Sequence, residues 1–208
     1  MLKFSSFILK RISVKFNVHK LIKFVDLGFI LIEKFAVKLD KLLPFYLEFN
    51  DKMIENEIEL AKISNKDKIL HIGCGAIPAT SILLAKKTGA QVTGIDKDIF
   101  SIKQALICLS KLNFSDKVQV KHAEAQTFPV QMFDLIIVSQ GVKPYCETLK
   151  YISQSMKPDA RVVFRTSSTI NGELSENDRF INDIFRVNKI VYQKQNGLLL
   201  SILLLKQS

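Results

Sequence analysis

The chain has 208 residues, 48% of them hydrophobic and 24% charged, which is typical of a soluble globular protein and long enough for one α/β domain with a modest appendage. Its cysteines, Cys74, Cys108 and Cys146, form no CxxC pair or Cys/His cluster, so we expect no metal site and a reducing, cytoplasmic setting. No stretch reaches the ~18 uninterrupted apolar residues of a membrane span. We expect no secretory signal, because basic residues at positions 10, 11 and 15 break up any apolar segment there.

The first 65 residues are predicted to form a separate helical region. Their apolar residues recur at helical spacing, and Pro44 is expected to divide helices before and after it, with Asn50 or Asp51 capping the second. Residues 1–25 hold six basic residues and no acidic one, within a chain of net charge +10. A lysine-rich proteome explains that charge as well as a functional role does, because net charge bears on partners and solubility rather than on fold.

From Lys66 onward, short apolar runs alternate with longer amphipathic ones. The predicted strands are Ile69–Ile72, Gln91–Ile95, Val118–Lys121, Leu135–Val138 and Arg161–Arg165, and the predicted helices are Ala79–Lys87, Ile99–Lys111 and Tyr145–Ser155. This alternation predicts a Rossmann-like, doubly wound α/β sheet, mainly parallel, with helices on both faces. We assign the polar segment between Arg165 and Asp178 only to a loop at the rim of this sheet.

The C-terminal segment departs from the alternation. Two strand-like runs are joined by Asn196-Gly197, a strong signal for a β-hairpin. A parallel α/β sheet that ends in an antiparallel hairpin, about seven strands in all, resembles the class I S-adenosylmethionine (SAM)-dependent methyltransferases. The resemblance covers about Lys66 to Lys206 and makes residues 66–208 the expected SAM-binding domain.

Five motifs carry the resemblance, and they imply a set of cofactor-binding residues. The "HIGCG" turn, Gly73–Cys74–Gly75, would let the backbone pass close to SAM. Asp96, followed by Lys97, ends the second strand twenty-one residues after Gly75, a spacing suited to ribose hydroxyls. After the third strand Glu124 and Ala125 would address the adenine. "FDLIIVSQG" and "MKPDARVVFRT" resemble the fourth and fifth strands, and Ser139 follows the fourth.

His71 departs from the family pattern, which usually has an acidic residue that helps to hold the amino group of SAM. A histidine could instead favour the SAM carboxylate, or it could be a buried residue with satisfied packing. Ile77-Pro78 argues against a dinucleotide, because it would obstruct a pyrophosphate on the helix N-terminus.

The segment "GCGAIPATSILLA" is similar to a motif of nicotianamine synthases, a branch of this fold that transfers the aminocarboxypropyl group of SAM. That branch has a helical N-terminal region with a glutamate before the first strand, and Glu57 lies closest to that position. Alternatively, Glu55, Glu57 and Glu59 form a solvated helix face.

The sequence leaves the reaction open. Methyl transfer to a small molecule is our first expectation, because it is commoner on this fold. The alternative is nicotianamine synthase-like aminocarboxypropyl transfer that builds a metal-chelating, opine-type product, and a non-catalytic SAM-binding or membrane-surface protein ranks lower. An amine acceptor must lose a proton, so Glu57 would be a useful base. Gln140 and Tyr145, with Ser139, are candidates on the acceptor side.

Three roles for the N-terminal region stay open. It could be a lid over the acceptor pocket, a homodimer surface, or a basic amphipathic helix whose residues 1–25 contact an anionic membrane. We favour the lid, because so many aromatic side chains need somewhere to pack. Nucleic acid is disfavoured as a partner, because no ordered basic and aromatic groove is visible.

Overall fold

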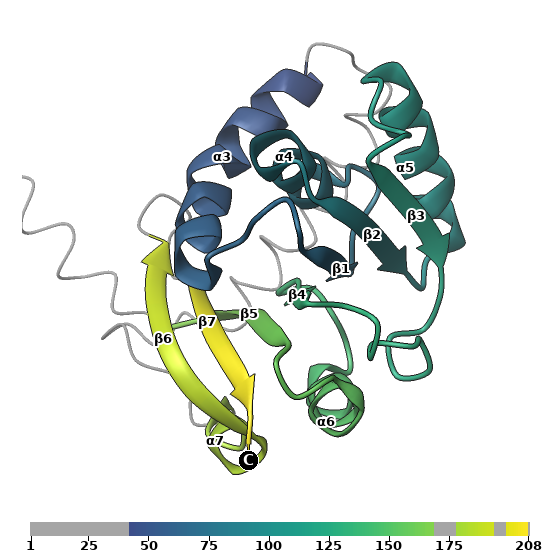
Figure 1. The fold of residues 1–208 in the computed structure, drawn as a ribbon. Helices are drawn as coiled ribbons and strands as arrows, with labels where there is room; N and C mark the ends of the chain where they lie inside the picture. The colour runs from purple at the N-terminus through teal and green to yellow at the C-terminus, as the bar shows by residue number, and fades with distance from the viewer. Residues whose placement is uncertain (1–41, 169–177, 194–198, 208) are drawn as a thin grey trace, which may run out of the picture. The chain divides into compact units, whose positions relative to one another are not determined.

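The computed structural model describes residues 42–168, 178–193 and 199–207. Its centre is a seven-stranded sheet of order β3-β2-β1-β4-β5-β7-β6, drawn in Figure 1. The strands are β1 (Lys68–Ile72), β2 (Gln91–Asp96), β3 (Val118–His122), β4 (Leu135–Val138), β5 (Arg161–Ser167), β6 (Phe185–Gln193) and β7 (Leu199–Lys206). From β1 the chain adds β2 and β3 on one side and β4 and β5 on the other. Open α/β sheets bind their ligands at this switch point between β1 and β4.

Helices cover both faces of the sheet (Figure 1). They are α3 (Leu42–Ala61), α4 (Ala79–Thr88), α5 (Ile99–Lys111), α6 (Tyr145–Ser155) and α7 (Ile181–Ile184). Buried residues of α3, α4 and α5 pack on one face of the sheet, and those of α6 and α7 pack on the other. All residues of β4 are buried, as a central parallel strand requires. The predicted doubly wound fold is confirmed.

The C-terminal strands close the sheet in antiparallel fashion. β7 pairs with β5 on one side and with β6 on the other, both antiparallel. The predicted antiparallel pair is therefore confirmed, while the Asn196-Gly197 turn itself lies outside the described residues. The side chains of β7 alternate between the two cores, so Ser201 faces the α3 side among apolar neighbours.

Helix α3, the second of the two expected helices, begins earlier than predicted. It runs without interruption from Leu42 to Ala61, with Pro44 in its first turn. A proline at this position costs the helix no hydrogen bond, because the first N–H groups of a helix have no partner within it. The predicted caps are therefore wrong: the Asn50 amide donates to the carbonyl of Tyr46 at 2.8 Å, and Asp51 accepts from Lys87. Any helix before Pro44 lies outside the described residues.

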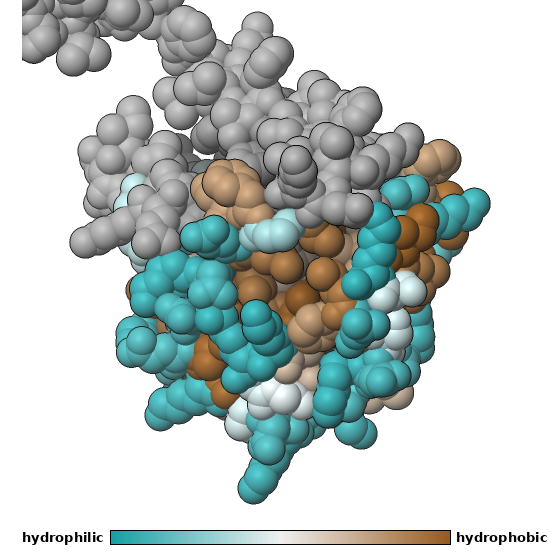
Figure 2. Space-filling model, turned by 90° about the horizontal axis from the view of Figure 1, so that it is seen from above, coloured by the Kyte–Doolittle hydropathy of each residue, from teal (hydrophilic) through white to brown (hydrophobic). Residues whose placement is uncertain are grey.

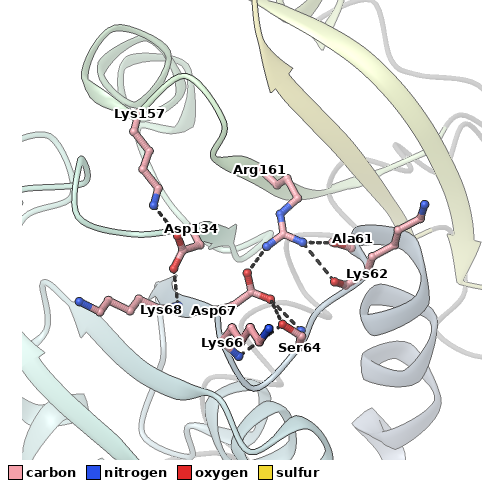
Figure 3. Close-up of polar contacts among 9 residues, drawn as sticks. All are labelled: Ala61, Lys62, Ser64, Lys66, Asp67, Lys68, Asp134, Lys157 and Arg161. Carbon is pink, nitrogen blue, oxygen red and sulfur yellow. Dashed lines mark hydrogen bonds and ion pairs between the residues drawn. The ribbon is translucent and has the colours of Figure 1, made fainter.

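A polar cluster fixes the C-terminal end of α3 to the amino ends of the parallel strands (Figure 3). The Arg161 guanidinium, at the start of β5, donates to the carbonyl oxygen of Ala61 and to the Asp67 carboxylate. Beside it Asp134 accepts from Lys157. These groups anchor the chain between α3 and β1, and they lie away from the candidate site described below.

Large apolar side chains remain exposed on the helical layer of α3 and α5. Phe45 is 66% exposed and Phe100 is 63% exposed. Seen from above, apolar residues form an area framed by polar ones (Figure 2). No helix in the described part of the chain is long and apolar enough to cross a membrane.

Candidate active site

The glycine turn after β1 adopts a backbone conformation that requires glycine. Gly73 has a φ of 77° and Gly75 a φ of 69°, a region that L side chains rarely enter. A Cβ on Gly73 would also lie 2.7 Å from Cγ2 of Val142, in the loop after β4. The close approach that makes Gly73 necessary here is therefore to the chain itself, and it brings the turn against the loop after β4.

Asp96, the predicted ribose ligand, lies against this turn. One oxygen of its carboxylate accepts from the N–H of Gly75 at 2.9 Å, and the other accepts from the N–H of Asp98 at 2.9 Å. Asp96 stays partly exposed at the tip of β2. A carboxylate accepts about four hydrogen bonds, so Asp96 has capacity left for the hydroxyls of a ribose.

Other predicted cofactor residues lie just after the carboxyl ends of β1, β2 and β3. Just beyond β3, Glu124 is exposed and Ala125 is buried. The exposed Lys97 donates from Nζ to the carbonyl of Lys143 at 2.9 Å, so it bridges the loops after β2 and β4. Cys74 is buried, 3% exposed.

Cys74 packs against a glycine that the sequence analysis did not single out. A Cβ on Gly94, in the middle of β2, would meet Cβ of Cys74 at 3.0 Å and Sγ at 3.2 Å. Gly94 therefore lets the glycine turn fold down onto the sheet.

His71 is buried at the end of β1, and both nitrogens of its ring have partners. Nδ1 lies 2.9 Å from Oγ of Ser81 in α4, and Nε2 lies 2.8 Å from Oγ of Ser139 after β4. Burial, and then the nearby Arg165 guanidinium, lower the pKa of His71 to about 3. The ring is therefore neutral at physiological pH and offers no positive charge to a SAM carboxylate. Through these two contacts, His71 links α4 to the loop after β4.

The acceptor-side candidates lie at the carboxyl ends of β4 and β5. Gln140 donates from its amide to Oγ of Ser167, the last residue of β5. Tyr145 begins α6, and its ring stacks on Phe164 with 5.7 Å between centroids. Burial, followed by the hydrogen-bonded carboxylate of Asp178, raises the pKa of the Tyr145 hydroxyl. Tyr145 is therefore a neutral phenol held in place by an aromatic stack.

Glu57 is the only one of the three neighbouring glutamates that is buried. Its side chain has no exposed surface, whereas Glu55 and Glu59 are exposed. The Arg165 guanidinium, near the end of β5, binds both oxygens of the Glu57 carboxylate, from Nε at 2.8 Å and from Nη2 at 2.7 Å. Its Nη1 donates to Oγ1 of Thr80 in α4 at 2.9 Å. The solvated helix face therefore holds for Glu55 and Glu59 and is wrong for Glu57.

A chain of polar groups continues from Glu57 through β7 to β6, the strand at one edge of the sheet. The hydroxyl of Ser201 in β7 donates to Oε1 of Glu57 at 2.7 Å, and the amide of Gln193 in β6 donates to Ser201 at 3.0 Å. Asn56 of α3 then donates to Gln193 at 2.8 Å. Because each of these groups has a partner, the cluster avoids the cost of unpaired buried polar atoms.

Sequence reasoning missed Arg165, Thr80, Ser81 and Ser201 as parts of the site. One signal was present: the apolar run of β5 gives way to Arg-Thr-Ser-Ser at the carboxyl edge of the sheet, where parallel sheets bind ligands. Among the described residues, no cluster of histidine, cysteine, aspartate or glutamate side chains could hold a metal ion.

Comparisons with known proteins agree with this geometry. A family profile described as "Methyltransferase domain" matches residues 63–203. The chain is 25% identical over 124 residues to an L-histidine 2-aminobutanoyltransferase of Pseudomonas aeruginosa, covering 57% of this chain and 46% of that protein. It is 24% identical over 152 residues to ribosomal RNA small subunit methyltransferase A of Fusobacterium nucleatum, covering 73% of this chain and 47% of that protein. It thus spans about half the length of these curated relatives.

Among solved structures, the fold is similar to that of a variant of MtNAS in complex with S-adenosylmethionine. The TM-score is 0.76, with 20% identity, over 88% of this chain and 75% of that chain. At this identity the likeness concerns the fold. The family match covers more than half of the sequence, and the chain therefore belongs to the methyltransferase domain family of SAM-dependent transferases.

Proposed function

We propose that the protein transfers the aminocarboxypropyl group of SAM to an amine of a small molecule. One observation carries this choice over methyl transfer. Arg165 binds both Glu57 and Thr80, so it joins the two segments whose sequences resemble nicotianamine synthases. The relative named L-histidine 2-aminobutanoyltransferase supports the same choice, because that name describes transfer of a four-carbon amino-acid group.

The site suits SAM without any group that binds phosphate. The glycine turn and Asp96 form one unit through the hydrogen bond from Gly75, and Asp96 keeps free capacity at the tip of β2. Pro78 precedes α4 and has no backbone N–H, so this helix N-terminus offers one hydrogen-bond donor fewer to a phosphate. The neutral His71 adds no charge that would oppose a sulfonium.

The reaction is a displacement at a carbon bonded to the sulfonium of SAM. The amine nitrogen forms a bond to the terminal methylene of the aminocarboxypropyl group, the carbon–sulfur bond breaks, and its electron pair stays on sulfur, so that methylthioadenosine leaves. The amine releases one proton. Orientation of the nitrogen in line with the leaving sulfur supplies much of the acceleration.

We assign the role of proton acceptor to Glu57, with Gln140 and Tyr145 shaping the acceptor side. The Glu57 carboxylate accepts three hydrogen bonds, two at Oε1 and one at Oε2, which leaves capacity at Oε2. Because Glu57 has no exposed surface, this role requires that acceptor binding open a path beside α3.

Methyl transfer is the second candidate. The glycine turn, Asp96 and the loop after β4 serve both reactions equally well, and the ribosomal RNA methyltransferase relative keeps nucleic acid among the acceptors to be tested. The lid, the homodimer and the membrane contact stay predictions, because residues 1–41 lie outside the described part of the chain. The cytoplasmic location also stays a prediction.

The by-product distinguishes the two reactions. The protein is incubated with SAM and a panel of amines that includes histidine, and the adenosine-containing product is identified by chromatography and mass spectrometry. Methylthioadenosine formed only with an acceptor present supports the proposal. S-adenosylhomocysteine as the product would replace it with methyl transfer. A Glu57→Gln variant should form little of either compound, and this result counts only under conditions where circular dichroism shows the variant folded and calorimetry shows that it binds SAM.

A further inference from the structure

We propose that Ser81, His71 and Ser139 form a hydrogen-bond chain that presents the Ser139 hydroxyl to the amino-acid end of SAM. His71 is a positioning residue in this chain, because it acts through Ser139 and does not itself contact the cofactor. The proposal rests on the proposed use of SAM, and it holds for either transfer reaction.

The chain is built from three separate segments. Ser81 in the first turn of α4 has no exposed surface, His71 in β1 is 2% exposed, and Ser139 after β4 is partly exposed. The ring nitrogens of His71 lie 2.9 Å from Ser81 and 2.8 Å from Ser139. Only the Ser139 end of the chain reaches the surface of the site, so a ligand would meet the chain there.

The order of the strands places the amino-acid end of the cofactor. Asp96, at the tip of β2, is suited to the ribose, and Glu124 follows β3 on the outer side of β2. Adjacent strands lie about 4.8 Å apart. If the ribose lies over β2 and the adenine lies toward β3, the rest of the cofactor extends the other way, over β1 and β4. Ser139 lies there, and its Oγ is 3.9 Å from the Cβ position of Gly73.

A neutral histidine suits this position. A neutral imidazole has one donor nitrogen and one acceptor nitrogen. If Nε2 donates to Ser139, the hydroxyl of Ser139 is free to donate to the carboxylate of the cofactor. If Nε2 accepts, the Ser139 oxygen is free to accept from the ammonium group. Either tautomer fixes the position of Oγ and leaves one hydrogen-bonding function for an end of SAM that carries both charges.

Two substitutions of His71 separate positioning from packing. The amide nitrogen of asparagine takes the place of Nδ1, so His71→Asn keeps the contact to Ser81 and loses the contact to Ser139. The longer glutamine places its amide nitrogen near Nε2, so His71→Gln keeps the contact to Ser139. Ser139→Ala removes the end of the chain, and it remains informative if a His71 variant fails to fold, because Ser139 is partly exposed.

The test compares two ligands that differ in the amino-acid group. Affinities of the full chain for SAM and for methylthioadenosine, which lacks that group, are measured by calorimetry. We expect His71→Asn and Ser139→Ala each to weaken SAM binding by roughly tenfold, the size of one hydrogen bond, and to leave methylthioadenosine affinity unchanged. His71→Gln should stay within about threefold of wild type, and the double variant H71N/S139A should be no weaker than either single variant.

Other outcomes overturn the inference. Equal loss of both ligands would mean that His71 only supports the fold, and unchanged SAM affinity in Ser139→Ala would mean that Ser139 does not touch the cofactor. Asp134→Asn serves as the control, because Asp134 lies at the amino end of β4, away from the site (Figure 3). This substitution weakens the contact with Lys157 and leaves the site unchanged. A wild-type chain that binds no SAM would overturn the proposed function as well, whereas normal binding with unaffected variants would overturn this inference alone.

Discussion

Glu57 and Arg165 form a two-point ion pair inside the protein, where Glu57 is fully buried and Arg165 is 6% exposed. The pair joins the middle of α3 to the carboxyl end of β5 across 108 residues of sequence. A buried ion pair contributes little net stability, because desolvation of both charges opposes their attraction. Its position beside Thr80 and near His71 therefore points to a role in the site.

Removal of one partner of this pair should destabilise the protein strongly. Glu57→Gln leaves Arg165 charged, buried and without its carboxylate, and we expect the free energy of unfolding to fall by about 3–5 kcal/mol. The double variant E57Q/R165M removes both charges and should recover most of this loss. Urea denaturation followed by circular dichroism measures both changes.

Glu59→Gln is the matched control, because Glu59 lies on the same helix and is exposed. It should change the free energy of unfolding by no more than about 0.5 kcal/mol. A double variant E57Q/R165M that is as unstable as Glu57→Gln, or more so, would contradict the claim that the uncompensated charge of Arg165 causes the loss.

The glycine turn makes a second prediction. Gly73→Ala places a Cβ at a positive φ and 2.7 Å from Val142, so we expect a loss of stability of about 1–3 kcal/mol. Gly141→Ala is the control, because a Cβ there would meet no atom within 4 Å, and it should be nearly neutral. Thermal denaturation of both variants tests the comparison, and equal effects at the two glycines would contradict the geometry.

The buried His71 predicts how stability depends on pH. The pKa of His71 is about 3 in the folded protein, against an ordinary value of 6.5, so between these values the unfolded chain binds a proton that the folded chain does not. The stability that the neutral ring permits is present above pH 6.5 and is lost as the pH falls toward 3. Between pH 7.5 and pH 5 the wild type should lose about 2 kcal/mol more than His71→Asn does. If urea denaturation shows that wild type and His71→Asn lose the same free energy of unfolding over this pH range, the lowered pKa of His71 is contradicted.

Local patterns predicted the sheet because strand and helix periods are local properties. The apolar run Leu135–Val138 predicts a central strand, and β4 is buried throughout between β1 and β5. The predicted caps at Asn50 and Asp51 are wrong because α3 already begins at Leu42, and a proline in the first turn of a helix does not interrupt it. The spacing from Gly75 to Asp96 predicts a ribose ligand at the tip of the second strand, and the structure places Asp96 in hydrogen-bond contact with Gly75 because the ends of neighbouring strands meet there.

The buried polar cluster could not be derived in the same way. Ser201 and Glu57 are 144 residues apart, and no periodicity relates a helix before the first strand to the last strand of the sheet. Glu55, Glu57 and Glu59 look alike in sequence, and only the packing of α3 decides which one is buried. The two serine partners of His71 could not be predicted either, because the fold alone brings α4 and the loop after β4 next to β1.

The fate of the SAM carbon atoms tests the central claim most directly. Wild-type protein is incubated with SAM that carries ¹⁴C in its carboxyl group and ³H in its methyl group, together with the amine that supports turnover. Aminocarboxypropyl transfer predicts that the acceptor product carries ¹⁴C and no ³H, while ³H remains in methylthioadenosine. An acceptor product that carries ³H without ¹⁴C would contradict the claim and establish methyl transfer.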